Sequence, residues 1–237
     1  MKTSSKQSKK HPAPDSKRRV FIVDDHPFLR EGLKEFVNQQ ADFTVCGEAG
    51  SVSEALEKIG PAKPDVAMVD LSLDGSSGLD LIKDLAVRFA RLPVLVLSMH
   101  DESLYAERSL RAGALGYVMK REPMSTVLLA LRRVATGQCY VSDKMAGKLI
   151  HQSLGRPAAA PTATPEELLS DRELEVFELI GQGHRRSTIA DALHISAKTV
   201  ETHTERIKEK LHLATADDLR QHATSWVQPI SNARTSR

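Results

Sequence analysis

The feature that most restricts the fold is an alternation of short apolar runs and helical patterns between residues 20 and 140. The first run, Val20–Val23, is apolar at every position, which is typical of a strand buried on both faces of a sheet. Similar runs follow at residues 44–49, 66–70, 94–98 and 117–119, and helices are expected at 27–39, 53–59, 77–89, 103–112 and 123–136. Five such units predict an α/β doubly wound five-stranded parallel sheet with helices on both faces.

A purely helical pattern begins after residue 165. Ser170 and Glu173 have the spacing of a capping box, which predicts the start of a helix. Two further helices are expected at about residues 186–193 and 197–211, separated by a three-residue turn, and a fourth is expected from Ala216 to about Trp226. This order predicts a small all-α helix-turn-helix domain.

Composition and periodicity divide the 237-residue chain into five segments. The start is rich in lysine and poor in apolar residues, so it cannot form a core. Residues 155–165 are rich in proline and alanine and have no periodicity, as expected for a linker. We therefore expect a disordered basic tail at 1–18, the α/β domain at 19–140, a helix and flexible linker at 141–165, the helical domain at 166–228 and a disordered tail at 229–237.

The cysteines and the distribution of apolar residues restrict the compartment. Cys46 and Cys139 have neither the spacing of a metal site nor the number needed for a disulfide framework, which indicates a reducing environment. No apolar stretch approaches the roughly 20 residues needed to cross a bilayer. The lysine-rich start lacks the apolar core of a signal peptide. We expect a cytoplasmic protein that makes no membrane contact.

Polar side chains follow the predicted strands of the α/β domain at their carboxyl ends. Asp24 and Asp25 end the first strand and Asp70 ends the third, while Ser98 ends the fourth and Lys120 follows the fifth. In a doubly wound sheet, ligands bind where these strand ends meet. Gathered carboxylates repel one another unless a cation such as Mg²⁺, which prefers oxygen ligands, lies between them. A lone aspartate at a strand end is usually a helix cap or a surface group, so the prediction depends on the whole set.

The sequence around these positions resembles the receiver domain of two-component response regulators. The resemblance covers about residues 19–140 and rests on Val23-Asp24-Asp25-His26-Pro27, Val69-Asp70-Leu71-Ser72-Leu73 with Gly78, Leu97-Ser98-Met99-His100, and Gly113 to Lys120. It implies a flavodoxin-like fold in which Asp70 accepts a phosphoryl group from a sensor histidine kinase. It also implies that Mg²⁺ is the cofactor, held by Asp25, Asp70 and the backbone carbonyl of Ser72, with Asp24 acting through water.

The same resemblance implies a switch beside the acceptor. Ser98 would move to hydrogen-bond the phosphoryl group, Tyr117 would turn inward into the space left, and Lys120 would contact the phosphoryl oxygens. A plain edge-strand role for Tyr117 stays open. The sequence departs from many receivers at Asp74, where proline is common, and at Met99, where a small residue is common, and either change could alter the lifetime of the phosphate.

A phosphatase of the haloacid-dehalogenase type is the enzyme alternative. Such enzymes also use an aspartate at a strand end together with Mg²⁺, but they have a second acid two residues after the acceptor. Ser72 occupies that position here, so the general acid is missing. We therefore expect no enzyme activity beyond slow autodephosphorylation.

The helical domain resembles the LuxR-type output domain, and the order of the two domains resembles the NarL/FixJ class of regulators. The resemblance rests on the stretches from Leu169 to Val176, from Ile189 to His203 and from Arg206 to Leu211. Residues 165–183 contain one basic and six acidic residues, whereas residues 184–213 contain six basic and four acidic ones. This segregation favours DNA contact by the second part alone.

By this resemblance, the second helix of the helix-turn-helix enters the major groove of double-stranded DNA. Arg185, Arg186 and Lys198 are expected to meet phosphates, while Glu201, Thr202 and Glu205 lie where side chains reach base edges. Two glutamates there have an equally good alternative in solvent or in ion pairs with Arg206 and Lys208. The full set of expected DNA-binding residues is Arg185, Arg186, Lys198, Thr199, Glu201, Thr202, His203, Glu205 and Arg206.

Together these features predict transcription controlled by phosphorylation of Asp70. At rest the receiver would cover the recognition helix, or alternatively phosphorylation would act by receiver dimerisation, and a homodimer is expected in the active state. Leu219 and Trp226 of the last helix are candidates for the dimer contact. The competing interpretations are a DNA-binding protein with a silent receiver and a receiver that regulates a protein partner.

Overall fold

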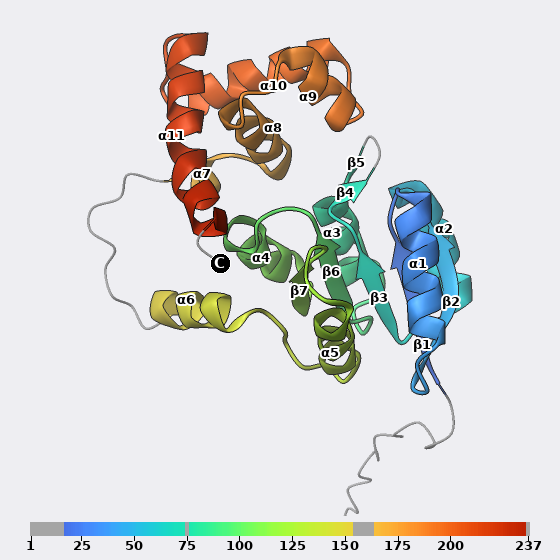
Figure 1. The fold of residues 1–237 in the computed structure, drawn as a ribbon. Helices are drawn as coiled ribbons and strands as arrows, with labels where there is room; N and C mark the ends of the chain where they lie inside the picture. Colours follow the sequence, from blue (N-terminus) through green and yellow to red (C-terminus); the bar gives the residue numbers. More distant parts are fainter. Residues whose placement is uncertain (1–16, 74–75, 154–163, 236–237) are drawn as a thin grey trace, which may run out of the picture.

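The computed structural model describes residues 17–73, 76–153 and 164–235, and within them an α/β domain precedes a helical domain (Figure 1). The described part of the α/β domain contains the predicted five-stranded sheet, in which all neighbouring strands are parallel. Its strands are β1 (Arg18–Val23), β2 (Phe43–Ala49), β3 (Val66–Val69), β6 (Val94–Ser98) and β7 (Gly116–Met119), in the order β2-β1-β3-β6-β7. The chain reverses its direction of winding between β1 and β3, which creates a switch point there.

Helices cover both faces of this sheet. They are α1 (Pro27–Asn38), α2 (Val52–Ala62), α3 (Gly78–Arg88), α4 (Glu102–Ala112) and α5 (Met124–Ala135). One face packs with α1 and α5 around Ile22 and Met68, and the other packs with α2, α3 and α4 around Phe21 and Val69. Because successive side chains of a strand point to opposite faces, strands that are apolar throughout supply both cores at once.

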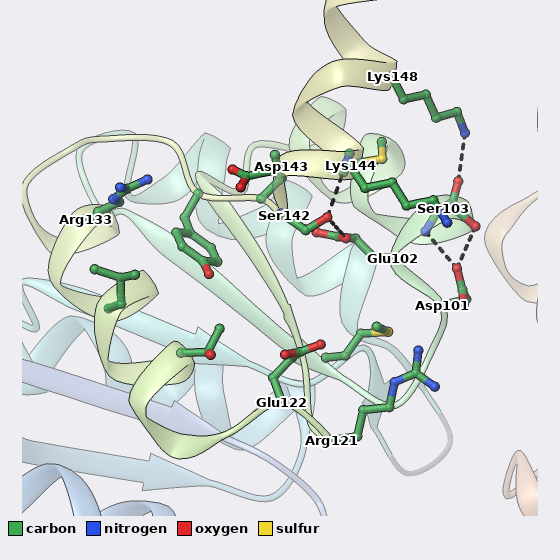
Figure 2. A pocket seen from close by; sticks show the side chains of 16 residues that line it. Asp101, Glu102, Ser103, Arg121, Glu122, Arg133, Ser142, Asp143, Lys144 and Lys148 are labelled. Carbon is green, nitrogen blue, oxygen red and sulfur yellow. Dashed lines mark hydrogen bonds between the residues drawn. The ribbon is translucent and has the colours of Figure 1, made fainter. Parts of the chain in front are cut away.

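Two elements of the α/β domain differ from the sequence prediction or extend it. The strands β4 (Ser72–Leu73) and β5 (Ser76–Ser77) form a small antiparallel pair directly after the acceptor position, which we did not predict. The expected helix after the receiver is α6 (Asp143–Ser153). It lies beside α4, where the backbone N–H of Ser142 donates to Glu102 at 2.8 Å and Lys148 donates to the Ser103 carbonyl at 2.9 Å (Figure 2).

The helical domain consists of α7 (Pro165–Leu168), α8 (Asp171–Gly181), α9 (Arg186–Ala192), α10 (Ala197–Lys210) and α11 (Ala216–Thr235). The predicted capping box at the start of α8 is present, since Ser170 and Glu173 each accept from the other's backbone N–H. Helices α8, α10 and α11 pack around Leu174, Phe177 and Ile207. The helices α9 and α10 form the predicted helix-turn-helix.

The C-terminal boundary is a correction. We expected the last helix to end near Trp226 and residues 229–237 to be disordered, but α11 continues to Thr235. No glycine follows Trp226, and although proline often ends a helix, Pro229 lies within α11. Residues 1–16 of the tail expected at 1–18 and residues 155–163 of the linker expected at 155–165 lie outside the described residues, while Arg18 already belongs to β1. In the described ranges, no helix has the length and apolarity to cross a membrane.

Candidate phosphoacceptor and DNA-binding sites

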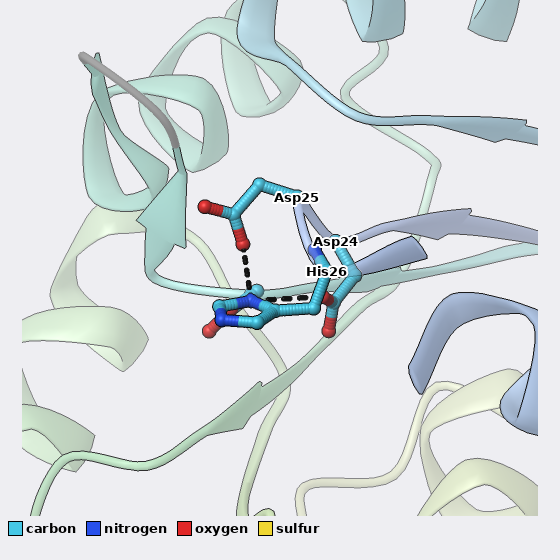
Figure 3. A group of neighbouring side chains, drawn as sticks. Asp24, Asp25 and His26 are labelled. Carbon is cyan, nitrogen blue, oxygen red and sulfur yellow. Dashed lines mark hydrogen bonds and ion pairs between the residues drawn. The ribbon is translucent and has the colours of Figure 1, made fainter. Parts of the chain in front are cut away.

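The sheet brings the predicted acidic residues together at the carboxyl ends of β1 and β3. Ligand atoms of Asp24, Asp25, His26 and Asp70 all lie within 4.8 Å of one another. Figure 3 shows the imidazole of His26 beside the carboxylate of Asp25, with His26 Nδ1 at 2.6 Å from Asp25 Oδ1. Strands β1 and β3 pair in parallel, and Val23 lies opposite Val69, so the ends of the two strands lie next to each other.

Lys120 joins this cluster from the end of β7. Its Nζ lies 2.6 Å from Asp70 Oδ2 and 2.7 Å from Asp24 Oδ2, and all three side chains are almost fully buried. Burial raises the pKa of Asp70 to about 6, although Lys120 opposes that shift. Burial also acts against the charged form of Lys120, but Asp70 and Asp24 outweigh it and raise the pKa of the ammonium. Lys120 therefore keeps its positive charge, and the carboxyl group of Asp70 titrates near neutral pH.

The charge of this cluster fits a divalent cation. Three carboxylates face one ammonium group, which leaves excess negative charge in a largely buried place. Carboxylate oxygens are the ligands that hard cations prefer. The backbone N–H of Ser72 donates to Asp70 Oδ1 at 3.3 Å, so the residue expected to supply the carbonyl ligand lies beside the cluster.

The expected switch residues adjoin the cluster, but one of them has a conformation that we did not expect. Ser98 is the last residue of β6 and Tyr117 is the second residue of β7, and both are fully buried. The hydroxyl of Tyr117 donates to the carbonyl of His100 at 2.9 Å, and burial raises the pKa of this phenol well above its usual value. Tyr117 is therefore already turned inward in this structure.

A surface hollow lies elsewhere on the α/β domain. It measures about 860 Å³ and is bordered by α4, α5 and α6 (Figure 2). Among the described residues, none of those predicted for phosphoryl transfer lines it. The candidate phosphoacceptor site is therefore the cluster of buried carboxylates with Lys120, and this hollow is separate from it.

The exposed side of α9 and α10 contains the expected DNA-binding residues. Ser196 caps α10 by accepting from the backbone N–H of Thr199 at 3.0 Å. His203, which we expected among the DNA-binding residues, is half-buried rather than exposed, and burial lowers its pKa. The exposed members of the set are Arg185, Arg186, Lys198, Glu201, Thr202, Glu205 and Arg206.

The two glutamates of this surface have basic partners. Glu205 pairs with Lys208, with 2.9 Å between Oε2 and Nζ, as the alternative interpretation expected. Glu201 lies 3.5 Å from Arg186 of α9 rather than pairing within α10. These pairs partly neutralise the negative charge on the face predicted to meet DNA.

Leu219 and Trp226, the expected dimer contacts of the last helix, pack within the helical domain. Leu219 is buried, and Trp226 packs on Phe177 of α8 with 5.3 Å between ring centroids. Gly181 allows this approach, because a Cβ there would lie 2.4 Å from the Ala223 carbonyl of α11. The prediction of a dimer contact is therefore contradicted for Leu219, which is buried inside the domain, whereas Trp226 is only partly buried and its role in a dimer stays a prediction.

The α/β domain contacts α8 rather than α10, the expected recognition helix. Asp171 lies 2.5 Å from Arg108 of α4 and 3.2 Å from Lys83 of α3, measured between carboxylate oxygens and side-chain nitrogens. Tyr105 of α4 donates to Glu178 at 3.4 Å. In this arrangement the exposed side of α10 stays open, contrary to the expectation that the receiver covers it.

Comparisons with known proteins match both halves of the chain. The family described as "Response regulator receiver domain" matches residues 20–132, and "Bacterial regulatory proteins, luxR family" matches residues 167–223. The oxygen regulatory protein NreC of Staphylococcus aureus (strain MRSA252) is 38% identical over 208 residues, which cover 86% of this chain and 96% of NreC. The chain belongs to the response regulators.

Solved structures agree with this fold for a response regulator. A LuxR-family two-component response regulator from Aurantimonas sp. SI85-9A1 has a TM-score of 0.55 and 27% identity, and the match covers 59% of this chain and all of that chain (100%). RcsB of Salmonella typhimurium has a TM-score of 0.60 at 24% identity over 88% of this chain and 98% of its own. The predicted fold class, a receiver followed by a LuxR-type DNA-binding domain, is confirmed.

Two histidines of this response regulator were missed by the sequence prediction as parts of the site. His26 joins the acidic cluster, and its position directly after Asp24 and Asp25 was a usable signal. His100 connects the acceptor loop to the helical domain, which no local pattern indicates, because its partners lie 28 and 78 positions away in the sequence.

Proposed function

We propose that Asp70 of this response regulator accepts a phosphoryl group from a sensor histidine kinase and thereby controls DNA binding. The observation that supports this most directly is the contact of Lys120 with both Asp70 and Asp24 at the carboxyl edge of the sheet. A cation in that position neutralises the oxygens of a phosphoryl group on Asp70. Ser98 is adjacent, and its hydroxyl accepts from the His100 backbone N–H at 3.2 Å.

Mg²⁺ is the proposed cofactor. Asp25, Asp70 and the Ser72 carbonyl would hold it, with Asp24 acting through water, and the ion would supply further positive charge to the transferred group. The residues of this chain orient the acceptor: the β1–β3 pairing fixes its position and Lys120 holds its carboxylate.

The direct test uses wild-type protein and the Asp70→Asn variant with MgCl₂ and acetyl phosphate. Wild type should gain the mass of one phosphoryl group, while Asp70→Asn should gain none, as should wild type with a chelator. If neither protein is labelled, even with a kinase, the receiver is silent. An electrophoretic mobility assay on the same samples tests DNA binding, and its absence at low salt in every state would favour a protein partner.

Mg²⁺ binding should depend on pH because of Asp70. Burial raises the pKa of its carboxyl group to about 6, so below that pH the metal must displace a proton. We expect the Mg²⁺ affinity to fall by up to about tenfold for each pH unit below 6 and to level off above 7. Calorimetric titration between pH 5 and 8 measures this. Asp70→Asn should lose the slope, and an unchanged slope in that variant would assign the proton to another group.

For the helical domain, we propose that the exposed side of α9 and α10 contacts double-stranded DNA. Arg185, Arg186, Lys198 and Arg206 would meet phosphates, and Glu201, Thr202 and Glu205 would face base edges. The support for this is their common exposure on the helix-turn-helix and the scarcity of basic residues on the neighbouring α8.

Two substitutions on this surface should have different effects. Lys198→Ala should weaken binding to all sequences and reduce the salt dependence by about one counterion. Glu201→Ala should relax the preference at particular base pairs and also release Arg186. Selection of bound sequences from a random pool, with titrations at several salt concentrations, measures both effects. Uniform weakening by both variants would contradict the role of Glu201.

The docked arrangement favours control by receiver dimerisation over control by release of the recognition helix. The exposed side of α10 is open while α8 is held by Arg108 and Lys83. Because the recognition helix is already open, phosphorylation does not need to uncover it. The step that phosphorylation can control is then the pairing of two copies on two DNA half-sites. The active form is therefore proposed to be a homodimer, with a dimer contact that does not use the buried Leu219.

A further inference from the structure

His100 lies between the acceptor loop and the helical domain. It follows β6 by two residues, and its backbone is tied to both expected switch residues, since its N–H donates to Ser98 and its carbonyl accepts from Tyr117. Its ring packs on Tyr105 with 4.4 Å between centroids, and only 17% of its side chain is exposed. The ring is thus held in a fixed place at the domain interface.

The two ring nitrogens face different domains. Nε2 lies 3.0 Å from the hydroxyl oxygen of Ser72, two residues after the acceptor Asp70. Nδ1 lies 3.5 Å from Oε2 of Glu178 in α8, and the side chain of Glu178 is 8% exposed. One imidazole therefore connects a residue of the acceptor loop with a carboxylate of the helical domain.

The chemistry of these partners determines which nitrogen has the proton. A carboxylate only accepts, so the contact with Glu178 requires a hydrogen on Nδ1. In the neutral ring Nε2 is then an acceptor, and the Ser72 hydroxyl donates to it. A carboxylate that orients a histidine in this way also orients whatever the other nitrogen contacts. Glu178 thus fixes the rotamer of Ser72 through His100.

We propose that His100 is a positioning residue for phosphoryl transfer to Asp70, and that Glu178 of the helical domain holds it in place. This rests on the proposed function, in which the Ser72 carbonyl is a metal ligand. Docking of α8 orders the Ser72 loop and so strengthens Mg²⁺ binding. Because coupling between two sites is reciprocal, Mg²⁺ must favour docking by the same factor.

The test measures Mg²⁺ binding by calorimetry in the full-length protein at pH 8. His100→Ala and Glu178→Ala should each weaken binding by roughly tenfold, the size typical of lost support for a metal ligand. The double variant should be no weaker than either single variant, because both changes break one connection. Glu178→Gln keeps an oxygen acceptor and should bind almost as wild type does.

A matched control separates this connection from general loosening of the interface. Tyr105→Phe removes another hydrogen-bond donor to Glu178 but keeps the ring against His100, so Mg²⁺ affinity should not change. In phosphorylation by acetyl phosphate, the His100→Ala and Glu178→Ala variants should need more Mg²⁺ for half-maximal rate yet reach the wild-type rate at saturation. Partial unfolding would lower the saturated rate instead.

The outcomes are distinguishable. If wild type binds Mg²⁺ and is phosphorylated while His100→Ala binds the ion equally well, the positioning role is wrong and the proposed function stands. Equal weakening by Tyr105→Phe would also overturn it, because interface packing would then be the cause. If wild type neither binds Mg²⁺ nor accepts a phosphoryl group, the proposed function fails and this inference fails with it.

Discussion

Replacement of Lys120 by methionine is expected to lower the free energy of unfolding of the metal-free protein by about 3–5 kcal/mol at pH 8. The Lys120 ammonium is buried between Asp70 and Asp24, at 2.6 and 2.7 Å from their carboxylate oxygens. Methionine has nearly the same length and keeps the packing, but it leaves two buried carboxylates without their cation. Removal of one partner from a buried ion pair costs more than the pair itself contributes.

The loss should depend on pH with a definite sign. The pKa of Asp70 in the folded protein, about 6, lies above its usual value, so the folded state binds this proton more tightly than the unfolded state does. Such a group destabilises the fold increasingly as the pH rises through 4 to 6. Without Lys120 the pKa rises further, so the difference between variant and wild type should grow from pH 4 to pH 8. Urea denaturation at several pH values measures it.

Lys58→Met is the matched control for Lys120→Met. Lys58 pairs with Glu54 on the surface of α2 and is half exposed. Its loss should cost less than about 0.5 kcal/mol, as is usual for an exposed pair within a helix. Mg²⁺ should restore part of the stability of Lys120→Met, because a ligand that binds only the folded state stabilises it. Equal losses in the two lysine variants would contradict the buried charge arrangement.

Gly78→Ala is expected to destabilise the receiver by about 3 kcal/mol and to weaken Mg²⁺ binding. A Cβ at position 78 would lie 2.1 Å from the carbonyl oxygen of Asp70 and 2.6 Å from the Cα of Leu71. These are backbone atoms, which cannot rotate away as a flexible side chain can. The added methyl group must therefore displace the peptide that carries the acceptor.

Gly32→Ala serves as the control for Gly78→Ala. Gly32 lies within α1, and among the described residues no atom beyond its chain neighbours and its own helix backbone would come within 4 Å of its Cβ. Alanine favours the helix over glycine by about 1 kcal/mol, so this variant should be slightly more stable than wild type. Thermal unfolding followed by circular dichroism gives both values. A stability of Gly78→Ala equal to that of wild type would show that the acceptor loop can move aside.

Much of the acceptor site follows from local sequence. Strands that are apolar at every position must be buried on both faces, and five strand–helix units allow few arrangements other than a parallel sheet. The carboxyl ends of such strands share one edge, so the proximity of Asp24 to Asp70 was predictable. The capping box at Ser170 was equally local, because its donors and acceptors lie within four residues.

Other features depend on contacts between distant parts of the chain. The partners of His100, the pair between Arg186 and Glu201, and the burial of Trp226 against Phe177 are all set by how helices pack. A polar or aromatic side chain on a helix has the same local pattern whether it meets another domain, DNA or solvent. For this reason, our sequence prediction placed Trp226 in a dimer contact and expected the receiver to cover the recognition helix.

The sequence by itself determined which strands are buried, where they end and that carboxylates gather around one lysine. The reason is that burial gives the apolar residues of each strand and helix a regular spacing that can be read from the sequence. Only the tertiary structure decided which surface of the helical domain meets the receiver and that Tyr117 is turned inward. Those choices depend on the fit of charged and aromatic side chains across α4 and α8, such as Asp171 with Arg108, and nothing in a local period encodes such a fit.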